Sequence, residues 1–214
     1  VRDESGASKA LGGDMALESE PSPFGDGVVS ADKTAGEANV SIRDCAFTGQ
    51  TPGYGVSSSN YVAADLIDIE MTGCEIADWG WGVVAFGSGG EIAIEATGNG
   101  FLGNGGFFYA DAALTGVQNA SANYWGATDP AVLAASILGA VDYTPWLGGG
   151  TDLMPGFAGD YSELWVDDDG AQVGGGRIAE AIGLVSGSTV HLMEGAFTAP
   201  AQIVIDRDMN LEGA

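Results

Sequence analysis

Positive charge is scarce in this sequence. Its 214 residues include 6 Lys and Arg and a single His against 30 Asp and Glu, which gives a formal net charge of −24 at pH 7. Binding to nucleic acid needs clustered cations, and so does docking on an anionic membrane surface. The sequence also lacks an apolar run near the roughly 18 residues of a membrane-spanning helix. We therefore expect neither nucleic acid as a partner nor insertion into a membrane.

Cysteine is nearly absent as well. Cys45 and Cys74 are the only two, which is too few for a disulfide scaffold. A hydrophobic content of 45% argues against disorder, and 36 glycines indicate a chain with many turns. An acidic, lysine-poor surface is typical of secreted or salt-adapted proteins. We therefore expect an extracellular or cell-surface location.

A short pattern recurs at intervals of 29, 25 and 24 residues. Its clearest copies are residues 67–76 and 92–101, with an earlier copy at 40–47 and a degenerate one at 119–125. Apolar and polar residues alternate within each copy, which predicts short β-strands. A strand, a bend, a second strand and a Gly-rich turn form one coil of a solenoid, and parallel coils stack about 4.8 Å apart.

Equivalent positions of the copies should form columns that run along the solenoid. One column contains Cys45, Cys74, Asn99 and Asn123, and the column two residues further on contains Phe47, Ile76, Phe101 and Trp125. Stacked asparagine side chains can hydrogen-bond along such an axis. We therefore expect Asn99 and Asn123 to form an inward-facing structural ladder at a corner.

Two later segments carry a family resemblance. Residues 123–130 read Asn-Tyr-Trp-Gly-Ala-Thr-Asp-Pro, and residues 141–147 read Val-Asp-Tyr-Thr-Pro-Trp-Leu. With the coils, they resemble the closing segment of secreted right-handed parallel β-helix proteins of the pectin-lyase-like superfamily. The resemblance implies an all-β fold. Between the segments, Asp129 as N-cap and Pro130 in the first turn predict a short helix to Leu138, ended by Gly139.

The C-terminal part resembles the beginning of such a β-helix, with a capping helix at 176–185 and a first coil at 188–213. Ile178, Ile182 and Val185 share one face of the expected helix. The sequence is then a slice of a longer tandem protein, or a subunit whose terminal strands complete a neighbour. The expected segments are an irregular or partial first coil (1–25), the coils with their closing segment (26–147), a linker (148–160) and a cap-like α+β segment that begins a second β-helix (161–214).

The resemblance also implies a chemistry to look for, because enzymes of this superfamily cleave or epimerise acidic polysaccharides. Lyases and epimerases need a cation, or bound Ca²⁺, beside the uronate and a base to abstract a proton. Hydrolases need paired carboxylates. Arg43 is the only cation in the repeat copies, which departs from the lyase pattern. We therefore assign no catalytic residue and expect no required cofactor.

Two pairs of carboxylates are candidate Ca²⁺ ligands. Glu70 and Glu95 are expected on adjacent coils, where like charges repel unless salt or Ca²⁺ intervenes. The alternative for Glu70 is a surface ion pair with Arg43. Asp167 and Asp169 belong to an Asp-Asp-Asp-Gly turn without the spacing of an EF-hand, and its alternative is a solvated acidic turn.

Three further features remain open at this point. Trp79, Trp81, Phe107, Phe108 and Tyr109 would stack on sugar rings if they are exposed, whereas packing inside the coil is the alternative. Cys45 and Cys74 occupy equivalent positions in adjacent coils and could form a disulfide, or stack as buried thiols. His191 lies between Val190 and Leu192, so we expect it to point outward as a structural residue.

The sequence favours a non-catalytic function. We expect a structural or adhesive module of a large secreted or cell-surface β-helix protein, in adhesion, matrix or filament building. Open β-helix ends have unpaired strand edges, so residues 188–213 could pair head to tail with a neighbour near residues 26–47. One alternative is a polysaccharide-binding or polysaccharide-modifying protein with glycan along the face from Trp79 to Tyr109. Another is a trimeric phage or viral spike.

Overall fold

The computed structural model describes residues 15–18, 29–32, 37–49, 53–60, 66–87, 90–199 and 201–213. For 15–18, 29–32 and Glu37 it describes the backbone only. Most of the expected first segment, 1–25, lies outside these ranges. The described residues form a parallel β-solenoid of about 6 turns with two short helices, so the predicted all-β parallel β-helix is confirmed.

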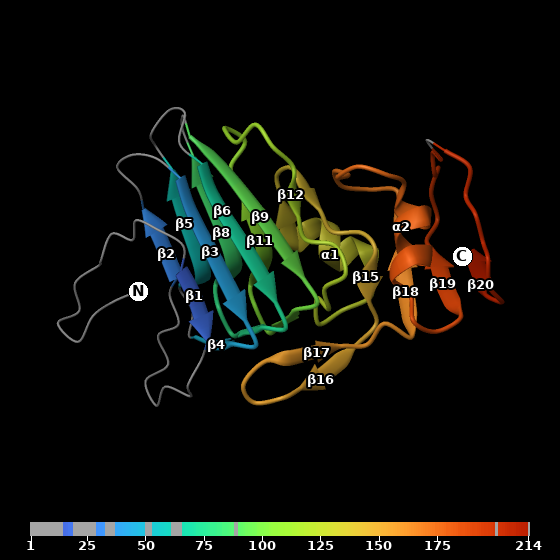
Figure 1. Cartoon of the computed structure of the whole chain (residues 1–214), viewed down its shortest axis with the longest axis horizontal. Coiled ribbons are helices and arrows are strands. Elements are labelled where there is room, and N and C mark those ends of the chain that lie inside the picture. The colour runs from blue at the N-terminus through green and yellow to red at the C-terminus, as the bar shows by residue number, and fades with distance from the viewer. Residues whose placement is uncertain are drawn as a thin grey trace.

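Three parallel sheets run along the long axis of the molecule, from the N-terminal end to the closing segment (Figure 1). The first contains, in order, β1 (Met15–Glu18), β3 (Glu37–Arg43), β6 (Leu66–Thr72), β9 (Glu91–Thr97), β12 (Gln118–Asn119) and β14 (Val141–Asp142). The second contains β2 (Val29–Asp32), β5 (Tyr54–Asn60), β8 (Trp81–Gly87), β11 (Gly106–Ala110) and β13 (Ile137–Leu138). The third contains β4 (Ala46–Thr48), β7 (Glu75–Ala77) and β10 (Gly100–Leu102).

The core of the solenoid is built from columns of apolar side chains in register. Val40, Ile69 and Ile94 are Cα partners in β3, β6 and β9, and all three are buried. Their neighbours along each strand alternate between exposed and buried. Each inward side chain is therefore covered by the equivalent side chain of the next coil, and apolar burial of this kind contributes roughly 25 cal/mol per Å².

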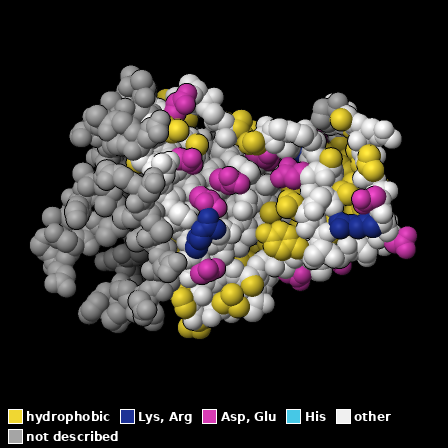
Figure 2. Space-filling view, in the orientation of Figure 1, with side chains coloured by type: hydrophobic (Ala, Val, Ile, Leu, Met, Phe, Trp, Pro, Cys, Tyr) yellow, Lys and Arg dark blue, Asp and Glu magenta, His cyan; other side chains and the backbone are white. Residues whose placement is uncertain are grey.

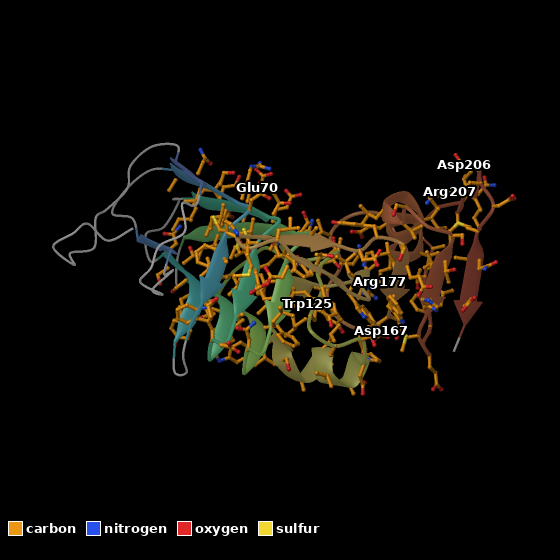
Figure 3. All side chains as sticks on the ribbon, turned by 90° about the horizontal axis from the view of Figure 1, so that it is seen from below. Glu70, Trp125, Asp167, Arg177, Asp206 and Arg207 are labelled. Atoms are coloured by element: carbon orange, nitrogen blue, oxygen red, sulfur yellow. The ribbon has the colours of Figure 1, made fainter. Side chains whose placement is uncertain are left out.

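The strands of the third sheet carry the second predicted column. Phe47 is the Cα partner of Ile76, and Ile76 is the Cα partner of Phe101. The Phe101 ring stacks on Trp125 with centroids 4.6 Å apart, and Figure 3 shows Trp125 inside the stack. Gly73 and Gly98, which precede these positions, have φ of 66° and 69°, a conformation that glycine adopts without strain.

A ladder of buried amides follows the same corner. Asn123 Oδ1 accepts hydrogen bonds from the backbone N–H and the Nδ2 of Asn99, at 2.8 and 3.1 Å. Asn99 Oδ1 in turn accepts from the backbone N–H of Cys74 at 2.9 Å. Asn123 Nδ2 donates to the carbonyl oxygens of Ala96 and Ala120. The ladder thus satisfies backbone groups that the corner leaves without strand partners.

The short helix after the coils, α1 (Pro130–Ser136), begins as predicted, since Asp129 Oδ1 accepts from the N–H of Ala131 at 2.9 Å. It ends two residues earlier than the predicted Leu138. Ile137 is buried and pairs with Phe108 of β11, so 137–138 continue the second sheet as β13. Burial of Ile137 in the solenoid therefore overrides the local preference for helix.

Residues 148–160, for which we expected a linker, contain an antiparallel hairpin of β16 (Gly150–Asp152) and β17 (Phe157–Gly159). The hairpin packs against the corners of the coils. Phe157 donates its N–H to the carbonyl oxygen of Gly73 at 2.7 Å, and its ring lies parallel to that of Tyr124 at 6.1 Å. A Cβ on Gly100 would lie 2.6 Å from the Phe157 ring, so the glycine makes room for this contact.

A second, smaller block follows the hairpin. Its sheet contains β15 (Trp146–Leu147), β18 (Glu163–Val166), β19 (Thr189–Leu192) and β20 (Asn210–Gly213), in that order. The strands β18, β19 and β20 are parallel, and α2 (Arg177–Leu184) connects β18 to β19. Ala181 and Val185 of the α2 segment pack with Leu164 and Val190 in a separate apolar cluster.

Substitution of the amide ladder tests how far it supports the solenoid. Asn123→Ala leaves the N–H of Asn99 and two buried carbonyl oxygens without partners, so we expect a loss of about 2 kcal/mol or more in the free energy of unfolding. The control is Asn119→Ala, because Asn119 is only partly buried and accepts one hydrogen bond, from Ser121. Urea unfolding of the two variants measures the difference, and equal losses would contradict the role of the ladder.

Candidate functional site

A cluster of aromatic rings covers the outer face of the second sheet. Tyr54 lies 5.9 Å from Phe86, Phe86 lies 5.6 Å from Tyr109, and Tyr109 lies 5.8 Å from Trp81, measured between ring centroids. The four rings belong to β5, β8 and β11, which are adjacent strands. Tyr54 is 41% exposed, and the other three rings are partly exposed. We name these four residues the aromatic cluster.

The strand register explains how the cluster is held in place. Val56, Val83 and Phe108 are Cα partners whose side chains fill the core. Val84 follows Val83 in β8, so it takes an outward position, where its Cα partner is Tyr109. Val84 is nevertheless only 1% exposed, because neighbouring side chains cover it. A Cβ on Gly106 would lie 2.4 Å from the Trp81 ring, so this glycine lets the indole lie flat over β11. The rings therefore lie over a sheet whose inner face is buried in the core.

The predicted sugar-contacting residues divide into two groups. Trp81 and Tyr109 belong to the aromatic cluster, whereas Trp79, Phe107 and Phe108 are buried. Trp79 donates its Nε1–H to the carbonyl oxygen of Phe47 at 3.0 Å, inside the solenoid. The sequence analysis missed Tyr54 and Phe86. The register of β5 against β8 could have indicated Tyr54, since Tyr54 is the Cα partner of Trp81.

The outer face of the first sheet is acidic. Figure 2 shows acidic side chains scattered over this face around a small basic patch. Arg43 and Glu70 form an ion pair with 2.6 Å between Nη2 and Oε1, and both side chains are about half exposed. The register places Ser41, not Arg43, beside Glu70, so the arginine reaches across diagonally. An exposed pair of this kind contributes about 1 kcal/mol at most.

The candidate Ca²⁺ ligands do not come together in larger groups. Glu70 and Glu95 are Cα partners on adjacent strands, while Asp167 and Asp169 lie in the second block. Asp167 is buried, its Oδ1 accepts from the N–H of Asp168 at 2.8 Å, and burial raises the pKa of its carboxyl group. Among the residues that the structure describes, no group of three or more His, Cys, Asp and Glu could hold a metal ion.

The two cysteines lie inside the solenoid as buried thiols. The Sγ of Cys45 donates to the carbonyl oxygen of Arg43 at 3.1 Å, and that of Cys74 to the carbonyl oxygen of Thr72 at 3.4 Å. The hydrogen bond with Cys45, together with burial, raises the pKa of the Cys74 thiol far above its usual range. Cys74 is therefore a poor nucleophile, because the thiolate is the reactive form.

The junction between the two blocks contains a buried carboxylate. Asp142 of β14 accepts from the N–H of Val173 at 2.6 Å, and the N–H of Ala171 bonds to the carbonyl oxygen of Val141 at 3.2 Å. The loop before α2 thereby closes over the last strand of the first sheet. Burial raises the pKa of Asp142 to about 6, with the hydrogen bond from Val173 acting in the opposite direction. Figure 3 shows Asp167 and Arg177 in this region.

A cavity of about 380 Å³ lies between the first turn of α2 and residues 196–203. Its charged groups form hydrogen bonds with the protein, although the buried Nε of Arg177 has no partner among the described residues. Arg177 donates to the carbonyl oxygens of Asp168 and Gly170, and the Asp168 carboxylate accepts from the N–H of Ala196. The remaining walls are mixed, with apolar Ile178 and Phe197 beside polar Gln172, Thr198 and Gln202.

The C-terminal end of the molecule presents an uncovered strand. Among the described residues β20 pairs only with β19, so one edge of β20 carries unpaired backbone groups. Leu211 on this strand is an exposed apolar residue, and so are Val204 and Ile205 in the segment that precedes it. Asp206 and Arg207 lie beside them at the same end (Figure 3). We name β20 and residues 203–208 the end surface.

Comparisons with protein-family models, with curated proteins and with solved structures give no match. Within the described parts of the chain, neither helix has the length or the apolar character to cross a membrane. The fold therefore defines the class of protein, a parallel β-solenoid with a second block at its C-terminal end.

The buried Asp142 makes the stability of the junction depend on pH. Its pKa in the folded chain, about 6, lies above the ordinary value of 3.8. The contribution of this group to stability is therefore complete below about pH 3.8 and is lost as the pH rises through about 6. Asp142→Asn removes this dependence while it keeps an oxygen for the N–H of Val173. We expect the free energy of unfolding to fall less between pH 4 and pH 7.5 in the variant, by about 2 kcal/mol.

Urea unfolding at the two pH values measures this difference. The matched control is Asp68→Asn, because Asp68 is exposed on β6. Glu75 and Asp167 also have raised pKa values and contribute with the same sign, but equally in both variants. If Asp142→Asn and Asp68→Asn show the same pH dependence, the assignment to Asp142 is wrong.

Proposed function

We propose that this chain is a non-catalytic structural module of a large secreted or cell-surface β-helix protein, and that it continues end to end with further solenoid coils. Adhesion, matrix and filament building are the functions that such a module serves. The observation that carries the proposal is the end surface, where the parallel strands β18 to β20 end, among the described residues, with an unpaired edge and exposed apolar residues. The resemblance of the coils to the pectin-lyase-like superfamily supports a secreted location.

Exposure along one column supports continuation beyond β20. Leu164, Val190 and Leu211 are Cα partners in β18, β19 and β20. Leu164 and Val190 are both 0% exposed, whereas Leu211 is 39% exposed. In the first block, each such position is covered by the next coil. Another coil on β20 would bury Leu211 in the same way and would pair the free edge of the strand.

Net charge opposes contact between copies of the chain in dilute salt. A formal charge of −24 generates repulsion that falls off over about 10 Å at 0.1 M ionic strength and over shorter distances at higher salt. End-to-end contact between separate copies should therefore strengthen as salt is added. Contacts within a tandem chain are less sensitive, because the linked coils meet at high local concentration.

Sedimentation velocity over a wide range of protein concentration, at low and at high salt, tests end-to-end contact. We expect particles that lengthen with concentration and with salt, and rods in negative-stain images. Leu211→Asp places a charge on the end surface and should abolish the growth. Leu138→Asp is the matched control, because Leu138 is 41% exposed on β13, away from the end surface. A compact monomer under all conditions, insensitive to Leu211→Asp, would contradict association between copies.

The aromatic cluster favours a second candidate function, binding of polysaccharide. Flat arrays of partly exposed rings stack on the apolar faces of sugars. The strongly acidic surface repels uronates, so a neutral glycan is the ligand class that fits the cluster. Two of the four rings are the main candidates for contact with sugar. Trp81 lies over β11, and Tyr54 is the most exposed ring of the cluster.

Affinity electrophoresis against a panel of neutral and acidic polysaccharides tests this candidate. We expect retardation by a neutral glycan, and Trp81→Ala should weaken the affinity about tenfold, equivalent to about 1.4 kcal/mol. Trp165→Ala serves as the control, since Trp165 is a partly exposed indole in the second block. Equal effects of the two substitutions, or no retardation by any glycan, would refute a binding role for the cluster.

A further inference from the structure

The end surface also indicates which kind of coil it accepts. We infer that β20 repeats β1 of the first block, and that a coil of the β3 type fits its open edge better than the β1 end of another copy does. A β3-type coil here means a coil whose first strand has the same alternation of inward and outward residues as Val40-Ser41-Ile42-Arg43 in β3. This inference rests on the proposed function, because it names the partner of the same end surface.

A sequence match connects the two ends of the chain. Residues 14–18 read Asp-Met-Ala-Leu-Glu and residues 208–212 read Asp-Met-Asn-Leu-Glu, a separation of 194 residues. The first copy contains β1 and the second contains most of β20. Four of the five residues are identical, in the same order. The chain therefore contains the same strand motif twice, once in each block.

The two leucines of the match take equivalent places in their sheets. Leu17 is the Cα partner of the fully buried Ile42 in the first block. Leu211 is the Cα partner of the fully buried Val190, which puts it in an inward column of the second block. Both copies of the motif thus place leucine at the register position of a fully buried partner residue.

Backbone hydrogen bonding leaves β20 ready to accept a strand. Asn210 donates its N–H to the carbonyl oxygen of Ser188 at 2.6 Å, on the β19 side. Because successive residues of a strand direct their backbone groups to opposite sides, the N–H and C=O of Leu211 are directed to the open edge. In the first block β1 has β3 on its following side, in parallel register over four residues.

Charge distinguishes the β3-type coil from a second copy's β1. In the register of the first block, Glu18 is the Cα partner of Arg43, so the glutamate of the motif lies opposite an arginine. The same register on β20 places an arginine opposite Glu212. Pairing β20 with the β1 strand of another copy in motif register places Glu18 opposite Glu212, and like charges directly opposite are destabilising.

Grafting provides the test. Residues 19–49, which follow the first copy of the motif and include β2, β3 and β4, are repeated after Glu212 in the otherwise full chain. We expect the amide of Leu211 to exchange with deuterium at least tenfold more slowly in the graft than in the parent chain. A graft whose repeated copy carries Ile42→Asp is the core control, and it should lose this protection.

A charge swap tests the register. Arg43→Glu in the repeated copy should lower the protection of Leu211 several-fold, and Glu212→Lys in the same chain should restore it. If neither substitution changes the protection of the Leu211 amide, the β3-type register is wrong. A graft that gives no protection, while the parent chain still lengthens with concentration in sedimentation, would overturn this inference and leave the proposed function standing. If the graft gives no protection and the parent chain does not lengthen with concentration, both this inference and the proposed function are wrong.

Discussion

Coverage of each coil by the next is the interaction on which the rest of this structure depends. The coils are short, and each strand of a coil contributes only a few inward side chains to the core. Val40, Ile69 and Ile94 are buried because they stack in register, and the strand ladders keep them so. A solenoid of this kind has no self-contained core within one coil, so its stability is a sum over neighbouring coils. A coil at either end is covered on one side only, so the end coils are the least stable and the most prone to associate with other strands.

An end of a β-solenoid leaves strand edges and apolar side chains uncovered unless other residues pack over it. In this chain such packing is found at the junction between the two blocks. At the junction, the loop before α2 bonds to β14 through Asp142 and Val141, and the corner hairpin packs on Gly100 through Phe157. These contacts close the first block. The second block has a helix over its first strands but nothing over β20 within the described residues. The described residues thus show closure of the first block at the junction and an uncovered strand edge at β20.

Sequence periodicity was sufficient to predict the class of fold and the position of its columns. Spacings of 25 and 24 residues separate Cys74, Asn99 and Asn123, and hydrogen bonds now connect these three residues along the axis. Asp129 and Pro130 likewise marked the start of α1. These features are local or repeat at a nearly constant interval, so they can be predicted from the sequence alone.

Features that depend on tertiary packing could not be predicted in the same way. Trp79 and Trp81 are two residues apart, yet the first bonds to Phe47 inside the solenoid and the second lies on the surface, because a bend separates them. Tyr54 and Phe86 join the aromatic cluster only through the register between coils of unequal length. The hairpin at 150–159 has a glycine-rich sequence typical of a linker, but its strands pair and it contacts the corners of the coils.

Residue-resolved hydrogen exchange of the unmodified chain tests the central claim most directly, namely that each coil is protected by the next and that β20 lacks such a neighbour. In dilute solution we predict slow exchange for the amides of Ile69 and Val190, which lie inside their sheets, and fast exchange for the amide of Leu211 at the open edge. Protection of Leu211 should then rise as end-to-end contacts form. If Leu211 is as protected as Val190 in a dilute monomer, the second block is already closed, and the account of an open solenoid end is wrong.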